Sequence, residues 1–164
     1  MSVETRPEAD FHNGRPPDAV EPEDYAAINA AYAVLLAGVV FATRERVKQE
    51  PIRAGELLPL GAATFAVSKV IAREKIGTWV REPFVDDAGH GGQPRGRRLQ
   101  RAIGELVTCS RCVGAWSALG VVGLRAASPD AGRFVTAVLA TSAVNDWAQL
   151  GFAWARAKAN RVGR

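Results

Sequence analysis

Residues 25–43 read YAAINAAYAVLLAGVVFAT, nineteen consecutive residues without a charge, and charged side chains follow at once from Arg44. As an α-helix this stretch is about 28 Å long, because each residue adds about 1.5 Å along the axis. The hydrocarbon core of a bilayer is about 30 Å thick, so the stretch is long enough to cross it once. Its many alanines are also compatible with a core helix of a soluble bundle.

Three further stretches of low charge follow, at residues 57–75, 106–124 and 134–154. Together with residues 25–43 they predict an all-α fold, a small polytopic transmembrane helical bundle with four spans. Three spans plus one helix lying in the membrane interface are the alternative. The four segments form one membrane helical domain over residues 25–156, a size that suits a single domain.

Polar segments flank and interrupt this domain. Residues 1–24 combine seven acidic residues with four prolines, which predicts a disordered acidic tail. No signal peptide is expected, since no basic segment precedes the first apolar run. Residues 83–101 are rich in glycine and arginine and predict a flexible basic loop, and residues 157–164 form a basic C-terminal tail.

The distribution of basic residues predicts the orientation in the membrane. The N-terminal tail, the middle connection and the C-terminal tail carry 14 Lys and Arg residues, whereas the two other connections carry six. Cytoplasmic segments retain the excess of positive charge, so both termini and the loop at 83–101 are expected in the cytoplasm. The expected partners are the lipid bilayer, with anionic head groups at the basic loop, and a second copy or another membrane protein. Nucleic acid is not expected, because aromatic residues for base stacking are not interleaved with the basic residues of the loop.

Two cysteines, Cys109 and Cys112, are the residues with the most distinctive chemistry. On a continuous helix Glu105, Cys109, Cys112 and Trp116 share one face, since their spacings are four, three and four. The two thiols could perform thiol redox chemistry or bind a metal such as zinc. A structural role is the competing interpretation, because small side chains let membrane helices pack closely.

A complete zinc site needs about four ligands, and the cysteine pair supplies two. The chain has two histidines, His12 in the acidic tail and His90 in the glycine-rich loop. Metal binding would therefore require His90 or a second subunit.

Charges within the predicted spans point to an interhelical ion pair. Lys69 and Asp146 each lie 12 residues after the start of their stretch, at 57 and 134, and are therefore at the same depth. We expect them to pair, because charges inside a bilayer seldom face lipid. Lys69 extending to the interface is the alternative. Around this pair we expect a polar cluster at the cytoplasmic mouth, made by the two thiols with Lys69, Arg73, Glu105, Trp116, Asn145 and Asp146.

Small residues recur four apart in each span, a spacing that permits close approach of membrane helices. The pairs are Ala33 and Ala37, Ala62 and Ala66, Gly114 and Ala118, and Ala137 and Thr141.

A set of residues from 63 to 116 resembles a known bacterial family, catalogued as domain of unknown function 1360, which includes sporulation-associated proteins of the YjcA type. The matching residues are 63–71, 74–76, 81–84, 104–106, Cys109, Cys112, Gly114 and Trp116. The resemblance implies a multi-pass inner-membrane protein of unresolved role. Ser110 and Arg111 stand where the family usually has a proline and an aromatic residue between the cysteines, Lys69 where it tends to have Arg, and Glu74 where it tends to have Asp.

The sequence contains no nucleophile–base pair, phosphate-binding glycine loop or paired catalytic carboxylates. We therefore expect a non-enzymatic structural or interaction component of the membrane, without a cofactor. A cytoplasm-facing thiol-redox or metal-binding site at Cys109 and Cys112 is the alternative function. A soluble helical bundle that binds a partner is the second alternative.

Overall fold

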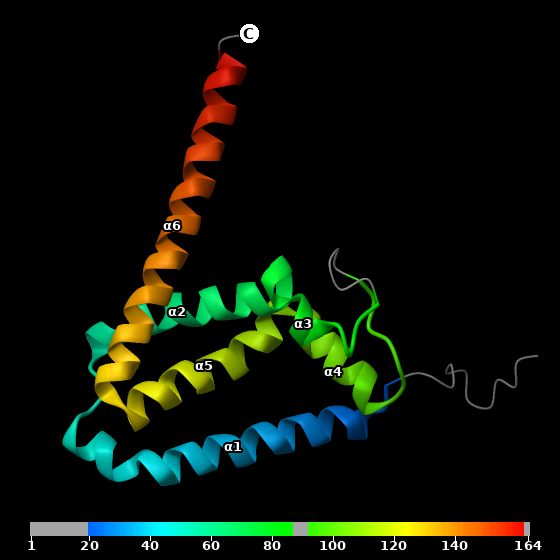
Figure 1. Cartoon of the computed structure of the whole chain (residues 1–164), viewed down its shortest axis with the longest axis vertical. Coiled ribbons are helices and arrows are strands. Elements are labelled where there is room, and N and C mark those ends of the chain that lie inside the picture. The colour runs from blue at the N-terminus through cyan, green and yellow to red at the C-terminus, as the bar shows by residue number, and fades with distance from the viewer. Residues whose placement is uncertain (1–19, 87–91, 163–164) are drawn as a thin grey trace, which may run out of the picture.

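The computed structural model describes residues 20–86 and 92–162, and over these ranges it is almost entirely helical, with no strand. The elements are α1 (Pro22–Gln49), α2 (Ala54–Arg73), the short 3-10 helix η1 (Lys75–Gly77), α3 (Thr78–Arg81), α4 (Leu99–Thr108), α5 (Ser110–Ala127) and α6 (Pro129–Val162). Helices α1, α5 and α2 lie one beside the next, and α6 rises away from them (Figure 1). The all-α fold is confirmed.

Helix α2 is the centre of the packing and contacts both α5 and α6. Leu60 and Ala63 of α2 pack against Val121 of α5, and Ala62 and Ala66 pack against Ala143 of α6. Small side chains at this crossing let the backbones of α2 and α6 approach closely. Of the four predicted small-residue pairs, Ala62 and Ala66 thus form a helix contact within the chain.

Two of the described helices, α1 and α2, are long and apolar enough to cross a membrane, and a third span is added if α4 and α5 count as one bent segment. The predicted spans at 25–43 and 57–75 coincide with these helices, although α2 ends at Arg73. Helix α6 contains the predicted fourth span, 134–154, but is not among the described helices that are apolar enough. Its Asn145, Asp146 and Gln149 lower the hydropathy of that segment.

The predicted third span, 106–124, is wrong at its start. The chain bends by 86° between α4 and α5, so residues 106–108 belong to α4 and the long helix begins at Ser110. The bend arises because α4 packs elsewhere: Val107 of α4 is buried against Val85, in the segment that follows α3. Gly104 fits this contact tightly, since a Cβ there would lie 2.5 Å from the Phe84 carbonyl oxygen.

In the basic loop predicted at 83–101, residues 83–86 and 92–101 make defined contacts, while residues 87–91 lie outside the described part. The last three residues of the loop form the first turn of α4, and Val85 pairs with Pro94 in an isolated antiparallel bridge. Arg98, at the start of α4, has a φ of 50° and reaches the acidic N-terminus of α1. Its guanidinium lies 3.1 Å from Glu21 and 3.6 Å from Asp24. The last residues of the predicted acidic tail are therefore helical or ion-paired, while residues 1–19 lie outside the described part.

A tight turn closes the C-terminal end of α2. Arg81 is 3% exposed and donates hydrogen bonds to the carbonyl oxygens of Ile71 and Glu74. These carbonyls lie at the end of the helix, where they have no partner within it. Gly77 is required here, because a Cβ would lie 2.1 Å from the Val70 carbonyl oxygen. Helix α2 therefore ends at a fixed position, next to the cysteine pair.

Candidate functional site

The two cysteines lie at the bend between α4 and α5. Cys109 is the N-cap residue of α5, with an extended backbone, and its Sγ accepts a hydrogen bond from the Cys112 amide at 3.3 Å. The Cys112 thiol donates to the same sulfur, with the two Sγ atoms 2.7 Å apart. Both cysteines are free thiols, Cys109 half-buried and Cys112 exposed. The pair thus occupies a helix N-terminus, where the partial positive charge of the helix favours a thiolate.

The bend overturns the prediction that Glu105 shares a helical face with the cysteines. Glu105 belongs to α4, which points in another direction from α5. Its carboxylate accepts a hydrogen bond from the Tyr25 hydroxyl and lies 3.8 Å from Arg101. Trp116 does lie on α5, where it makes an edge-to-face contact with Tyr32 at 5.3 Å.

Two arginines flank the thiols. Arg73, in the last turn of α2, donates from Nε to the Ser110 hydroxyl at 3.2 Å, so a guanidinium lies beside the residue that follows Cys109. Arg111, between the two cysteines in the chain, is exposed. The immediate surroundings of the pair are therefore cationic and open to solvent.

The described residues contain no group of three or more His, Cys, Asp or Glu side chains that could hold a metal ion. Cys109 and Cys112 supply two sulfur ligands, half of what a structural zinc site uses. His12 and His90, the two histidines considered as further ligands, lie outside the described residues.

Lys69 and Asp146 are brought together, as their equal depth predicted. The Lys69 ammonium lies 2.9 Å from Asp146 Oδ2 and 3.0 Å from Glu74 Oε1, so it bridges α6 and the end of α2. Each of these three side chains is between 31% and 44% exposed. Sequence reasoning missed the contact with Glu74, although this residue lies only five positions after Lys69, within reach of a lysine at the end of a helix.

The predicted polar cluster therefore divides into separate contacts. Lys69 and Asp146 form one ion pair, and Arg73 joins the cysteine segment through Ser110. Glu105 instead pairs with Tyr25 on α1. Asn145 is exposed on α6 beside Asp146.

A second ion-paired site, which sequence reasoning did not find, lies at the opposite end of α2. Arg125 is 2% exposed and donates to Glu56 twice, at 2.5 Å from Nε and 3.0 Å from Nη2. Arg133 pairs with Glu50 beside it and with Asp130 at 2.9 Å. The depth argument used for Lys69 and Asp146 would have found this pair, because Glu56 begins one predicted span and Arg125 ends another.

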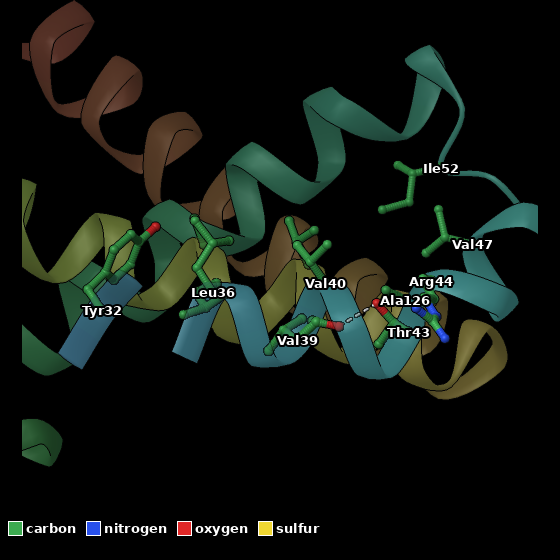
Figure 2. A pocket seen from close by; sticks show the side chains of 13 residues that line it. Tyr32, Leu36, Val39, Val40, Thr43, Arg44, Val47, Ile52 and Ala126 are labelled. Carbon is green, nitrogen blue, oxygen red and sulfur yellow. Dashed lines mark hydrogen bonds between the residues drawn. The ribbon is translucent and has the colours of Figure 1, made fainter. Parts of the chain in front are cut away.

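An apolar groove of about 530 Å³ separates α1 from α5 (Figure 2). Its lining is aliphatic and aromatic, with Arg44 as the charged residue at one end. The lining residues are Tyr32, Leu36, Val39, Val40, Thr43, Arg44, Val47, Ile52, Ala118, Leu119, Val122, Gly123 and Ala126. Within the groove the Thr43 hydroxyl donates a hydrogen bond to the Val39 carbonyl oxygen of the same helix, so the polar hydrogen of Thr43 already has a partner. This surface suits hydrocarbon, and its side-chain donors for a polar substrate are limited to the Tyr32 hydroxyl and the Arg44 guanidinium.

Comparison with known proteins gives one match. A family model described as "Protein of unknown function (DUF1360)" matches residues 59–152, from α2 into α6. No curated protein and no solved structure matches the chain. The matched region includes the cysteine bend and the Lys69–Asp146 pair, whereas α1 and Glu56 lie outside it.

Proposed function

The chain belongs to the DUF1360 family, and from this premise we propose that it is a multi-pass protein of the bacterial cell membrane that acts as a structural or interaction component. In the proposed arrangement the chain crosses the membrane four times, through α1, α2, α5 and the first two thirds of α6. Both termini and the cysteine bend lie on the cytoplasmic side.

The observation that carries the proposal is the exposure of α1. Only 6% of its most apolar 18-residue window is buried against the rest of the chain. Val34 is 71% exposed and Phe41 68%, on a helix of 28 residues. In water, so long an apolar surface would be costly to leave uncovered, whereas hydrocarbon solvates it. Lipid is therefore the environment that best suits α1.

The position of α6 supports its use as the fourth span. It begins beside Arg125, which pairs with Glu56 at the start of α2, and crosses α2 at an angle, with Asp146 reaching Lys69 near the other end of α2 (Figure 1). The helical distance from Phe134 to Trp154 is about 30 Å, which equals the hydrocarbon thickness. Beyond Trp154, Lys158 lies 5.2 Å from the centre of the indole ring, a basic and aromatic combination typical of the cytoplasmic interface.

An interaction role is supported by the small residues that the chain leaves uncovered. Ala33 and Ala37 on α1 are exposed, as are Ala137 and Thr141 on α6. Such faces let a second copy or another membrane protein pack closely. The exposed basic residues of the 83–101 segment and the C-terminal tail are proposed to contact anionic lipid head groups. Three of these arginines, Arg95, Arg98 and Arg101, also form ion pairs within the chain.

Alkaline carbonate extraction of membranes tests the proposal against a soluble bundle. The proposed protein stays in the membrane pellet, as an integral protein does. Release into the supernatant, or a monodisperse folded protein in buffer without detergent, would contradict it.

Cross-linking in intact membranes then tests the interaction role. Ala33→Leu is expected to reduce the amount of the cross-linked species. Val34→Leu, on the same turn, is expected to leave that amount unchanged.

A further inference from the structure

The geometry of the bend points to a thiol–disulfide exchange site at Cys109 and Cys112, and we propose that its substrate is a disulfide that carries carboxylates. The site goes beyond the structural role proposed above. Its place in the cytoplasm rests on the proposed orientation, whereas its chemistry does not.

Two contacts single out Cys109 as the attacking sulfur. As the N-cap residue of α5 it accepts the Cys112 amide at 3.3 Å, and it also accepts the Cys112 thiol. Each of these stabilises negative charge on Cys109, and the thiolate is the nucleophile in disulfide exchange. Cys112 donates in these contacts and is positioned to resolve the intermediate. The bend is essential, because in the middle of a continuous helix the Cys112 amide would bond to a carbonyl of the preceding turn.

The reaction balances with a disulfide as the electron acceptor. The Cys109 thiolate attacks one sulfur of the substrate, forming a mixed disulfide and expelling the other half as a thiolate. Cys112 loses its proton and attacks Cys109 Sγ, which forms the Cys109–Cys112 disulfide and expels the second half. Two electrons pass from the protein thiols to the substrate, and the two protons are taken up by the two leaving thiolates. The disulfide form is transient in a reducing cytoplasm.

The preference for an anionic disulfide follows from the flanking charges. Arg73 is held beside the pair by its 3.2 Å bond to Ser110, and the exposed Arg111 lies between the two cysteines in the chain. A carboxylate on the substrate pairs with a guanidinium, and such charge-assisted contacts orient the substrate. Glutathione disulfide has this chemistry and serves as the probe.

The test uses the full chain purified in detergent, so its outcome does not depend on orientation. Because the chain has only two cysteines, each single variant reports on one thiol. In glutathione redox buffer, the unsubstituted chain forms a reversible intramolecular disulfide, seen by mass spectrometry after alkylation. Cys112→Ser, which retains Cys109, forms the glutathione mixed disulfide about tenfold faster than Cys109→Ser. Equal rates in the two variants, or no intramolecular disulfide in the unsubstituted chain, would overturn the proposal.

The charge preference has its own matched pair of variants. Arg73→Gln slows reaction with glutathione disulfide but not with the neutral 2-hydroxyethyl disulfide. Lys75→Gln removes an equal charge from the exposed segment just after α2 and leaves both rates unchanged. The assignment of an anionic substrate would be overturned if Arg73→Gln slowed the reactions with the two disulfides equally. It would also be overturned if Arg73→Gln and Lys75→Gln had equal effects on the rates.

Discussion

Lys69 Nζ lies 2.9 Å from Asp146 Oδ2, although the two residues are 77 positions apart in the chain. The pair joins α2 to α6, and Glu74 adds a second carboxylate at 3.0 Å from Lys69 Nζ. A charge that faces hydrocarbon is costly, so a paired lysine at this depth stabilises the packed arrangement. The ion pair therefore sets how α6 lies on α2.

Reversing either charge of this pair should destabilise the bundle. Lys69→Asp or Asp146→Lys places like charges together, and we expect the thermal midpoint in detergent to fall by several degrees. Combining the two substitutions restores an attractive pair and should recover much of the loss. Recovery stays incomplete, because the carboxylate introduced on α2 then faces the carboxylate of Glu74. A double variant as unstable as the two singles would show that the two side chains do not interact.

The pair at the other end of α2 should be the more sensitive one, because Arg125 is almost completely buried. Glu56→Gln leaves that guanidinium without its bidentate carboxylate, and removing one partner of a buried pair costs about 3–5 kcal/mol. Glu45→Gln is the control, since Glu45 is 65% exposed and its pairs with Arg44 and Lys48 lie at the surface. Thermal unfolding in detergent measures both. Equal effects of the two variants would mean that Arg125 is not held by Glu56.

Gly132 allows the tight turn between α5 and α6. A Cβ at this position would lie 2.3 Å from the Cα of Arg125, too close for a real contact. Gly132→Ala should therefore shift the start of α6 and lower stability by more than about 1 kcal/mol. Gly151→Ala, on the same helix with no atom within 4 Å of its added Cβ, should be neutral or slightly stabilising. The prediction is wrong if the two substitutions have the same effect on the thermal midpoint.

The crossing of α2 and α6 should tolerate only small side chains. Ala66 is 4% exposed and packs beside Ala143, which is completely buried. Ala66→Leu should lower the free energy of unfolding by about 1–3 kcal/mol, because the added atoms force the two helices apart. Ala33→Leu adds the same atoms at an exposed position on α1 and should leave the thermal midpoint of the monomer unchanged. A well-tolerated Ala66→Leu would show that α2 and α6 do not meet closely there.

Sequence patterns predicted correctly those features of the structure that depend on local composition or on the depth of a residue within a span. The uncharged run at 25–43 predicted α1, and the equal depths of Lys69 and Asp146 predicted their contact. The helix break at Cys109 was not predictable in this way, because it depends on Val107 and Gly104 packing against Phe84, Val85 and Pro94, which are remote in sequence from α5. The Arg125–Glu56 pair could have been predicted from depth in the same way. Its two residues stand directly next to the ends of predicted spans, however, where charged side chains are ordinarily expected to face solvent.

The position of the C-terminus relative to the membrane tests the four-span arrangement most directly. In a Cys109→Ser, Cys112→Ser background, a cysteine is introduced either at exposed Gln49, the last residue of α1, or at exposed Ala159, near the end of α6. Intact cells with a permeable outer membrane are treated with an impermeant maleimide, and lysed cells provide the full labelling. The account predicts that Gln49→Cys is labelled in intact cells and that Ala159→Cys is labelled only after lysis. Labelling of Ala159→Cys in intact cells, or labelling of neither position before lysis, would contradict it.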